Sequence, residues 1–293
     1  MQLTGDGHVH SEWSFDTGGP KSASAGLMDA ICVRAVQLGL PALAFTEHLD
    51  VVGWLMEEED LLAEVEIGEQ LRSYTDSQGV LLPEPFDEAG YLECVERCRL
   101  KFPDLRILSG VEFGQPHLNE TRARQIVDLD SLDRVNGSLH TIPVSDEPGA
   151  VRAEPGTLYR KWPAAQVVRG YLAEVPRMVE GSAVFEVFCH IDYWVRSWPR
   201  DEEGPFNPRA FEEEYRQAMR AIAGSGRALE LNVGMTIRPW IPQWWREEGG
   251  RAITIASDAH APGPLANNLY EAMAMAEHFG FRPGRNPEDL WTR

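Results

Sequence analysis

The sequence is short of basic residues. Lys and Arg total 27 against 46 Asp and Glu, which gives a formal net charge of −19 over 293 residues. A surface that follows a nucleic-acid backbone needs a positive footprint, so no nucleic-acid partner is expected. An anionic small substrate stays compatible with this composition, because bound cations can reverse the local electric field.

Long apolar runs and cysteine pairs are also missing. No stretch approaches the roughly 20 apolar residues that a membrane helix requires, so no membrane partner is expected. The first residues lack the basic and apolar regions of a secretory signal peptide. The four cysteines form no C-x-x-C pair. We therefore expect a cytoplasmic protein with reduced thiols, in which Cys94 and Cys98 share one helix face and serve packing.

The sequence does contain a repeated alternation of short apolar segments and amphipathic stretches. Helical spacing predicts helices over residues 167–175 and 211–222, the latter with Pro208 at its start and Gly224 just past its end. Alternating strands and helices predict an α/β fold with a parallel sheet, most simply a closed barrel, in one domain over residues 1–293. The seven candidate strands are residues 2–9, 41–46, 106–112, 134–139, 183–189, 228–233 and 252–257.

Histidines gather where these candidate strands end. Glu112 and Asp258 occupy equivalent places, and the carboxyl ends of barrel strands converge on one face. Burying so many polar groups without partners would be costly, whereas divalent metals would satisfy them, so the pattern predicts a metal centre. His278 is expected to be structural, and His117 could line the site. The six histidines at strand ends are His8, His10, His48, His140, His190 and His260.

Seven short motifs, taken in order, resemble the PHP family, named for polymerase and histidinol phosphatase domains. Within that family the chain resembles the stand-alone histidinol-phosphatase-like phosphoesterases, over essentially its whole length. The resemblance implies a distorted (β/α)7 TIM-like barrel with the metal site at the C-terminal ends of the strands. The motifs are HVH at 8–10, TEH at 46–48, GVEFG at 110–114, GSLH at 137–140, CHID at 189–192, ELN at 230–232 and SDAH at 257–260.

The resemblance also implies two or three divalent metal ions. Imidazole and carboxylate ligands suit zinc, iron or manganese and do not choose among them. Asp6 and Glu47 lie beside ligands and are either partners of imidazole N–H groups or solvated acids. The implied ligands are His8, His10, Glu112 and Asp258 for the first position, Glu112 again with His140 and His190 for the second, and Asp16, His48 and His260 for the third.

The chemistry implied by such a site is hydrolysis of a phosphomonoester. A hydroxide shared between two metals would attack phosphorus, and L-histidinol phosphate is the first substrate suggested, with another small phosphorylated metabolite as the alternative. The residues expected to act in catalysis are Glu112, Asp258, His260 and Arg196. Arg160, Arg196 and His117 are the candidate substrate-binding residues, since an arginine fork suits a pair of phosphate oxygens.

Three long segments follow ligand-bearing strands, at residues 49–84, 141–163 and 193–208. We expect them to overhang the metal face, where loops set specificity. Trp54 is one of several tryptophans that could wall a pocket there.

Three other functions fit parts of the pattern. An amidohydrolase also begins with H-x-H and carries a late Asp on a barrel, but it would not need His48 or His260. A proofreading nuclease would need a basic surface, which the charge opposes. A non-catalytic metal-binding protein is the third alternative. The oligomeric state is left open.

Overall fold

The computed structural model describes residues 3–63, 67–145, 147, 149–234 and 237–293. Its main sheet has the strand order β1-β2-β5-β6-β9-β10-β11-β12. Neighbouring strands from β1 to β11 pair in parallel, and β12 pairs antiparallel with β11. The strands are β1 (Asp6–Val9), β2 (Ala42–Asp50), β5 (Arg106–Gly114), β6 (Arg134–Ser138), β9 (Val187–Phe188), β10 (Ala228–Asn232), β11 (Ala252–Ala256) and β12 (Trp291–Thr292).

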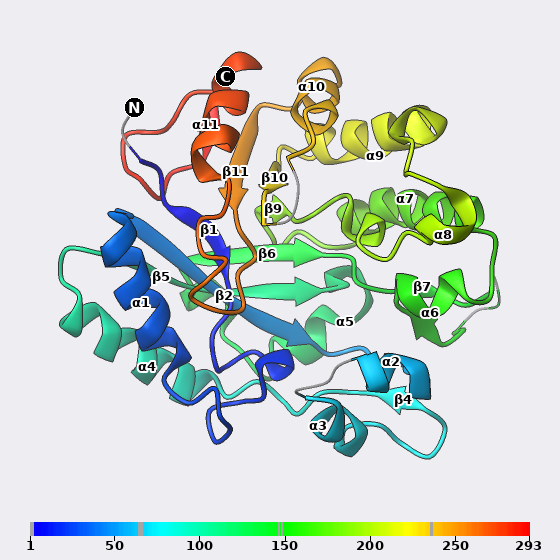
Figure 1. The fold of residues 1–293 in the computed structure, drawn as a ribbon, viewed down its shortest axis with the longest axis horizontal. Helices are drawn as coiled ribbons and strands as arrows, with labels where there is room; N and C mark the ends of the chain where they lie inside the picture. The colour runs from blue at the N-terminus through cyan, green and yellow to red at the C-terminus, as the bar shows by residue number, and fades with distance from the viewer. Residues whose placement is uncertain (1–2, 64–66, 146, 148, 235–236) are drawn as a thin grey trace.

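This sheet curls until its first and last parallel strands meet. Just beyond β11, the amide of Asp258 donates to the carbonyl of His8 at 2.9 Å, and the amide of His10 donates to the carbonyl of Ala259 at 2.9 Å. Val9 and Ala259 form a parallel bridge, and Figure 1 shows β1 beside β11. The seven parallel strands thus form the distorted α/β barrel that the sequence predicted.

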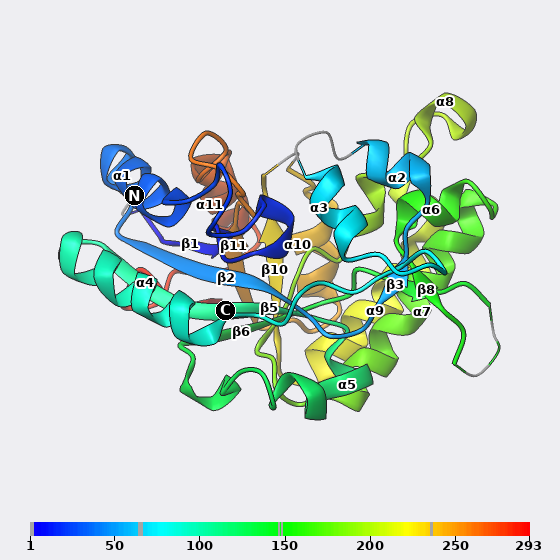
Figure 2. The same cartoon turned by 90° about the horizontal axis from the view of Figure 1, so that it is seen from below.

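Helices cover the outside of the sheet. Figures 1 and 2 show α1 and α4 along one flank and α7 and α9 along the opposite flank. The α-helices are α1 (Leu27–Leu38), α2 (Glu58–Ala63), α3 (Gly68–Ser73), α4 (Glu88–Lys101), α5 (Pro116–Ala123), α6 (Pro155–Tyr159), α7 (Ala164–Gly181), α8 (Arg200–Glu203), α9 (Glu212–Gly224), α10 (Trp240–Glu247) and α11 (Leu269–His278). Short 3-10 turns are Phe15–Thr17, Leu129–Ser131, Tyr193–Val195 and Pro208–Phe211.

Helix α9 forms where the apolar spacing predicted it. Asn207 accepts a hydrogen bond from the amide of Arg209 at 3.1 Å and so satisfies a free N–H group at the start of the 3-10 turn that leads into α9. Pro208 occupies the first position of that turn, and Gly224 is the last helical residue, so the helix ends slightly later than predicted. The face with Tyr215 is buried.

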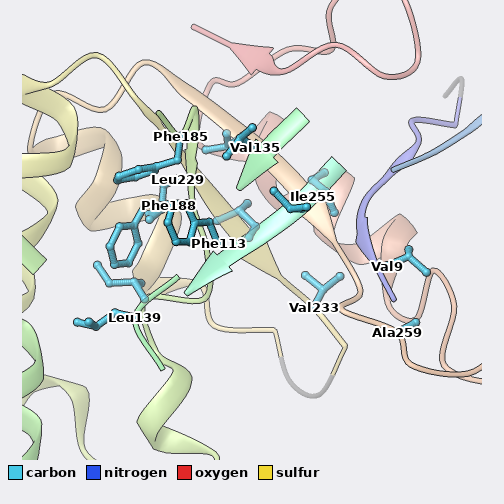
Figure 3. Packing of buried hydrophobic residues seen from close by; sticks show 14 of the residues in the cluster. Val9, Phe113, Val135, Leu139, Phe185, Phe188, Leu229, Val233, Ile255 and Ala259 are labelled. Carbon is cyan, nitrogen blue, oxygen red and sulfur yellow. The ribbon is translucent and has the colours of Figure 1, made fainter. Parts of the chain in front are cut away.

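Alternation along the strands gives the barrel an apolar outer layer and a polar interior. Figure 3 shows Phe113, Val135 and Leu229 in the apolar cluster that packs beneath the helices. The residues that alternate with them point to the other face. Glu112, Asn136 and Glu230 are among these inward residues, and all are buried.

A second, small sheet lies beside the barrel. It has the order β4-β3-β8-β7, and its strands are β3 (Trp54–Leu55), β4 (Val80–Leu81), β7 (Ile142–Pro143) and β8 (Arg152–Ala153). Trp54, Leu61, Leu71 and Leu81 form its own apolar cluster. Figure 2 shows β3 and β8 gathered with α2, α3 and α6 at one end of the molecule. Two of the long segments expected to overhang the metal face therefore join into one structure.

Several expected strands differ in length, and β2 and β5 run to Asp50 and Gly114, beyond their predicted ends at residues 46 and 112. The strand predicted at 183–189 is reduced to β9, although Glu186 and Cys189 still donate backbone hydrogen bonds to β6 at 2.9 and 3.0 Å. The first strand begins at Asp6, and Gln2 of the predicted segment lies outside the described residues. In the described part of the chain, no helix combines the length and hydropathy needed to cross a membrane. All four cysteines are free and buried, as expected.

Candidate metal centre

All nine residues predicted as ligands reach the same end of the barrel. The main cavity is lined by Asp16, His48, Glu112, His140, His190, Asp258 and His260. His8 and His10 lie beneath them and are fully buried. Convergence of strand ends is the reason, because β1, β2, β5, β6, β9 and β11 all point their carboxyl ends to this face.

Glu112 stands at the middle of the cluster. Its Oε1 lies 3.0 Å from Nε2 of His140 and 2.5 Å from Nε2 of His190. Its Oε2 lies 3.3 Å from Nε2 of His8 and 3.5 Å from Nε2 of His10. The two oxygens thus face two different groups of imidazoles, which is the arrangement of a carboxylate shared between two metal positions.

The ligand atoms on the Oε2 side fit a cation. Nε2 of His8 and Nε2 of His10 lie 2.9 Å apart, and Asp258 Oδ1 lies 3.2 Å from the latter. Glu112 Oε2 is buried and has no hydrogen-bond partner among the described residues. One ligand atom from each of His8, His10, Glu112 and Asp258 lies within 4.8 Å of all the others. Such a set of closely spaced nitrogen and carboxylate ligand atoms can hold a divalent metal ion.

A third group lies nearer the cavity mouth. Oδ2 of Asp16 is 3.3 Å from Nε2 of His48 and 3.0 Å from Nε2 of His260. The ring of His10 stacks against those of His48 and His260, with centroid separations of 4.4 and 4.0 Å. The structure therefore brings together the three residues expected to form the third metal position.

Two of the nine candidate ligands, His190 and Asp258, have unusual backbone conformations. His190 has φ 23° and Asp258 has φ 56°, in the left-handed region that side chains other than glycine rarely adopt. Gln115 shares this feature with φ 51°, and its Oε1 accepts a hydrogen bond from the amide of His140 at 2.6 Å. Backbone strain of this kind persists where the surroundings hold a functional geometry in place.

The carboxylates of the centre are held in their ionised form. Burial acts to raise the pKa of Glu112, but the imidazoles of His8 and His140 outweigh it and hold that pKa well below its usual value. Burial is likewise outweighed at Asp258, whose pKa is held well below its usual value by Arg196 and His8. Ionised carboxylates are the form that binds a metal ion.

His10 behaves differently from its neighbours. Burial lowers its pKa, and the nearby His260 and His48 lower it further, to about 3. His10 is therefore neutral at pH 7, which is the protonation state that an imidazole ligand requires.

Arg196 lies in the same cavity as the cluster. Its guanidinium donates a hydrogen bond to Oδ2 of Asp258 at 2.6 Å and lies over the ring of Tyr193 at 5.2 Å. Apolar side chains line the same cavity, among them Phe15, Trp54, Met56 and Ile67. Of the tryptophans considered in the sequence, Trp54 lines this cavity, whereas Trp194 is buried in the core.

The structure does not bring the other two candidate substrate-binding residues to this cavity. Arg160 pairs with Glu57 at 3.1 Å and with Asp60 at 2.7 Å. His117 lies 3.2 Å from Glu174, in a separate surface groove. Neither side chain is among the described residues that line the main cavity.

Several residues of the centre were not assigned a role from the sequence. Oε2 of Glu230 lies 2.7 Å from Nδ1 of His8, although the ELN motif around it was noticed. Asp50 lies 3.5 Å from Nδ1 of His48 and 3.5 Å from Nδ1 of His140. The sequence feature that could have identified Asp50 is its i, i+2 spacing from His48 on β2. Ser14 contacts His10, and nothing in the sequence singled out that serine.

Neither acid proposed as an imidazole partner bonds an imidazole directly. Asp6 accepts hydrogen bonds from the amides of Ser257 at 2.9 Å and Ala266 at 3.1 Å, so it fixes the loop after β11. Glu47 instead accepts from Ser11 and Ser14. Burial raises the pKa of Glu47 to about 7, against the opposing effect of the hydrogen bonds from Ser11 and Ser14.

Comparison with known proteins gives a consistent result. The sequence model of the PHP domain matches residues 6–234. The chain is 24% identical over 191 residues to a Clostridium acetobutylicum protein named "Probable histidinol-phosphatase", which covers 62% of this chain and 72% of that protein. Its fold is similar to histidinol phosphate phosphatase from Lactococcus lactis, solved with zinc, L-histidinol and phosphate, with a TM-score of 0.72, 20% identity and coverage of 98% of each chain.

Proposed function

Because this chain belongs to the PHP domain family, we propose that it is a metal-dependent phosphomonoester hydrolase. L-histidinol phosphate is the proposed substrate, with another small phosphorylated metabolite as the alternative. The observation that carries the proposal is the position of Glu112, whose two oxygens face separate groups of imidazoles beside the guanidinium of Arg196. The histidinol phosphatases among the similar proteins support the choice of substrate.

The proposed cofactors are two or three divalent ions of zinc, iron or manganese. His8, His10, Glu112 and Asp258 would hold the first ion. The second would be held by Glu112, His140 and His190, and a third by Asp16, His48 and His260. When bound, such ions generate a nucleophile from water near neutral pH and neutralise phosphate charge.

The protein's own side chains bind and orient the substrate. The Arg196 guanidinium, fixed by Asp258 and the Tyr193 ring, would hold two phosphate oxygens as a fork. Trp54 and Met56, among the apolar side chains that line the cavity, would cover the organic part of the substrate and exclude water. Arg160 and His117 would contribute only after a movement, since each is paired with acids away from the cavity.

Membership of the PHP family favours this function over the amidohydrolase alternative, which leaves Asp16, His48 and His260 without a role. We also propose a single domain over residues 1–293, since Asp258 and His260 beyond the matched region complete the same cluster. A cytoplasmic location and the absence of a nucleic-acid partner stay predictions.

A metal-restoration assay tests the proposal. Protein stripped with a chelator should release no inorganic phosphate from L-histidinol phosphate, and addition of zinc, manganese or iron(II) should restore release. The Glu112→Gln variant, treated in the same way, should stay inactive with every metal. Release that is unaffected by the chelator would contradict metal dependence. Inactivity on a broad panel of phosphomonoesters, despite a full metal complement, would contradict the reaction.

A further inference from the structure

Glu47 and Ser14 form a buried chain of hydrogen bonds that ends at His10. Both side chains are fully buried. The Ser14 hydroxyl donates to Oε2 of Glu47 at 2.7 Å, and its oxygen lies 2.9 Å from Nδ1 of His10. The backbone amide of His48 donates to the same oxygen at 3.1 Å.

These three contacts fix the direction of every hydrogen bond. A hydroxyl has one proton to donate and two lone pairs to accept with, and an ionised carboxylate only accepts. The proton of Ser14 therefore goes to Glu47, and one lone pair takes the amide of His48. The remaining lone pair needs a donor, so Nδ1 of His10 must carry its proton.

The other contacts of Glu47 are consistent with a carboxylate that accepts hydrogen bonds. The amide of Ser11 donates to Oε2 of Glu47 at 2.9 Å, and the hydroxyl of Ser11 donates to Oε1 at 2.5 Å. Together with Ser14 these make three donors around one buried carboxylate. The Ser11 amide can only donate, and three donors around one carboxyl group favour its ionised form, which accepts all three.

A neutral imidazole carries its proton on one nitrogen and a lone pair on the other. With the proton of His10 on Nδ1, the lone pair of Nε2 points at Oδ1 of Asp258, 3.2 Å away, and at Oε2 of Glu112, 3.5 Å away. We propose that Glu47, acting through Ser14, is a positioning residue that fixes His10 as the tautomer able to bind a metal ion.

His8 offers an internal comparison. Its Nδ1 lies 2.7 Å from Oε2 of Glu230, so one carboxylate acts directly on His8 while another acts on His10 through a hydroxyl. Partners of this kind orient the ring and set the tautomer of a metal-binding histidine. Each histidine of the HVH motif thus has a hydrogen-bond acceptor facing its Nδ1.

This inference rests on the proposed metal role of His10, and its test does not use phosphatase activity. Long-range proton–nitrogen NMR of the metal-free full chain, at pH 8.5 so that Glu47 is ionised, reports the tautomer of each histidine. We expect His10 to carry its proton on Nδ1 in the wild type. Ser14→Ala removes the acceptor that faces Nδ1, so the proton of His10 should move to Nε2, which faces Asp258 and Glu112.

Zinc affinity, measured by competition with a chelator, gives the second readout. Ser14→Ala should bind zinc about 10–100-fold more weakly. Ser22→Ala is the matched control, because the Ser22 hydroxyl lies in the same segment and donates to the carbonyl of Gly19 at 2.8 Å. It should keep the wild-type tautomer and affinity.

Two results would overturn the inference. One is a wild-type His10 protonated on Nε2, which needs no variant to fold. The other is a folded Ser14→Ala protein with unchanged tautomer and unchanged zinc affinity. Failure of the proposed metal role can be distinguished from failure of this inference. If His10 did not bind metal, His10→Ala would bind zinc as tightly as the wild type, while the wild-type tautomer would still be the one expected.

Discussion

Arg196 and Asp258 are joined by a hydrogen bond of 2.6 Å, while the second oxygen of Asp258 lies 3.2 Å from Nε2 of His10. Asp258 therefore links the cationic side chain of the cavity to the metal cluster. Among the described residues that line this cavity, Arg196 is the one arginine. A phosphate seated between that guanidinium and the metals would be held from both sides.

Replacing Arg196 with Ala should lower kcat/KM for a phosphomonoester by the equivalent of about 2–4 kcal/mol, because a charged hydrogen bond in a water-poor site is lost. Steady-state kinetics, with metal content checked in parallel, measure this effect. Arg209→Ala is the control, since that side chain is 84% exposed in the described structure. An unchanged kcat/KM for Arg196→Ala would remove Arg196 from substrate binding.

The number of metal ions bound should distinguish Glu112, proposed to be shared by two metal positions, from Asp16, proposed to belong to one. Glu112→Gln should lose two metal positions together, because its two oxygens face two groups of imidazoles. Asp16→Ala should lose only the third position, because Asp16 contacts His48 and His260 at its single Oδ2. Elemental analysis of protein purified without chelators gives the counts. Equal losses in the two variants would argue against a shared carboxylate.

Glu230 should act on metal affinity without touching a metal. Because it accepts from Nδ1 of His8 at 2.7 Å, Glu230→Gln should weaken zinc binding by about 10–100-fold. Chelator competition measures the change, and circular dichroism checks that the barrel is intact. Wild-type zinc affinity in a folded Glu230→Gln protein would mean that this contact serves packing alone.

Glu174 should contribute stability that depends on pH. Burial acts to raise its pKa, but His117 and Arg152 outweigh burial and lower that pKa to about 2. A carboxyl group with a lowered folded-state pKa stabilises the fold above its unfolded value, near pH 4.5, and loses this effect as pH falls toward 2.

Glu174→Gln should therefore lower the free energy of unfolding at pH 7 by about 1–3 kcal/mol, since Arg152 would stay buried without its charge partner. The difference from the wild type should shrink at pH 3.5. Urea unfolding of metal-free protein at the two pH values measures it. Glu213→Gln, with a side chain 76% exposed, should differ little from the wild type at either pH. A difference that grew on acidification would contradict the sign.

The sequence was sufficient to predict the barrel and to predict that the nine candidate ligands meet at one face of it. Parallel strands must send their carboxyl ends to one face, so histidines placed after successive strands had to meet. The small sheet could not be anticipated, because β3, β4, β7 and β8 have two residues each and show no alternation pattern. The same holds for β9, which is too short to have a periodicity of its own.

Side-chain pairing between distant segments was harder to foresee. Arg160 was expected near substrate, yet Glu57 and Asp60 lie about 100 positions away in sequence and bind it in the fold. Ser14 went unnoticed because a single serine carries no pattern, and its role depends on Glu47 reaching it from β2. Such contacts are fixed by tertiary packing and not by local spacing.

The proposed third metal position is the reason to expect a phosphomonoester as the preferred substrate. A phosphomonoester has three terminal oxygens, enough for each of three cations to meet one, whereas a diester has two. His260 lies 3.0 Å from Asp16 at that third group. His260→Ala should therefore lose monoesterase activity preferentially, as the ratio of the two activities in the variant and the wild type would show. Equal loss of both would separate His260 from this selectivity.

The most direct test compares two substrates on the metal-loaded wild-type protein. The rate of phosphate release from L-histidinol phosphate, or from a related amine-bearing phosphomonoester, should exceed the rate of cleavage of a bis-aryl phosphodiester. A preference for the diester, or hydrolysis of cyclic amides with no activity on any monoester, would contradict phosphomonoester hydrolysis and favour the nuclease or amidohydrolase alternative.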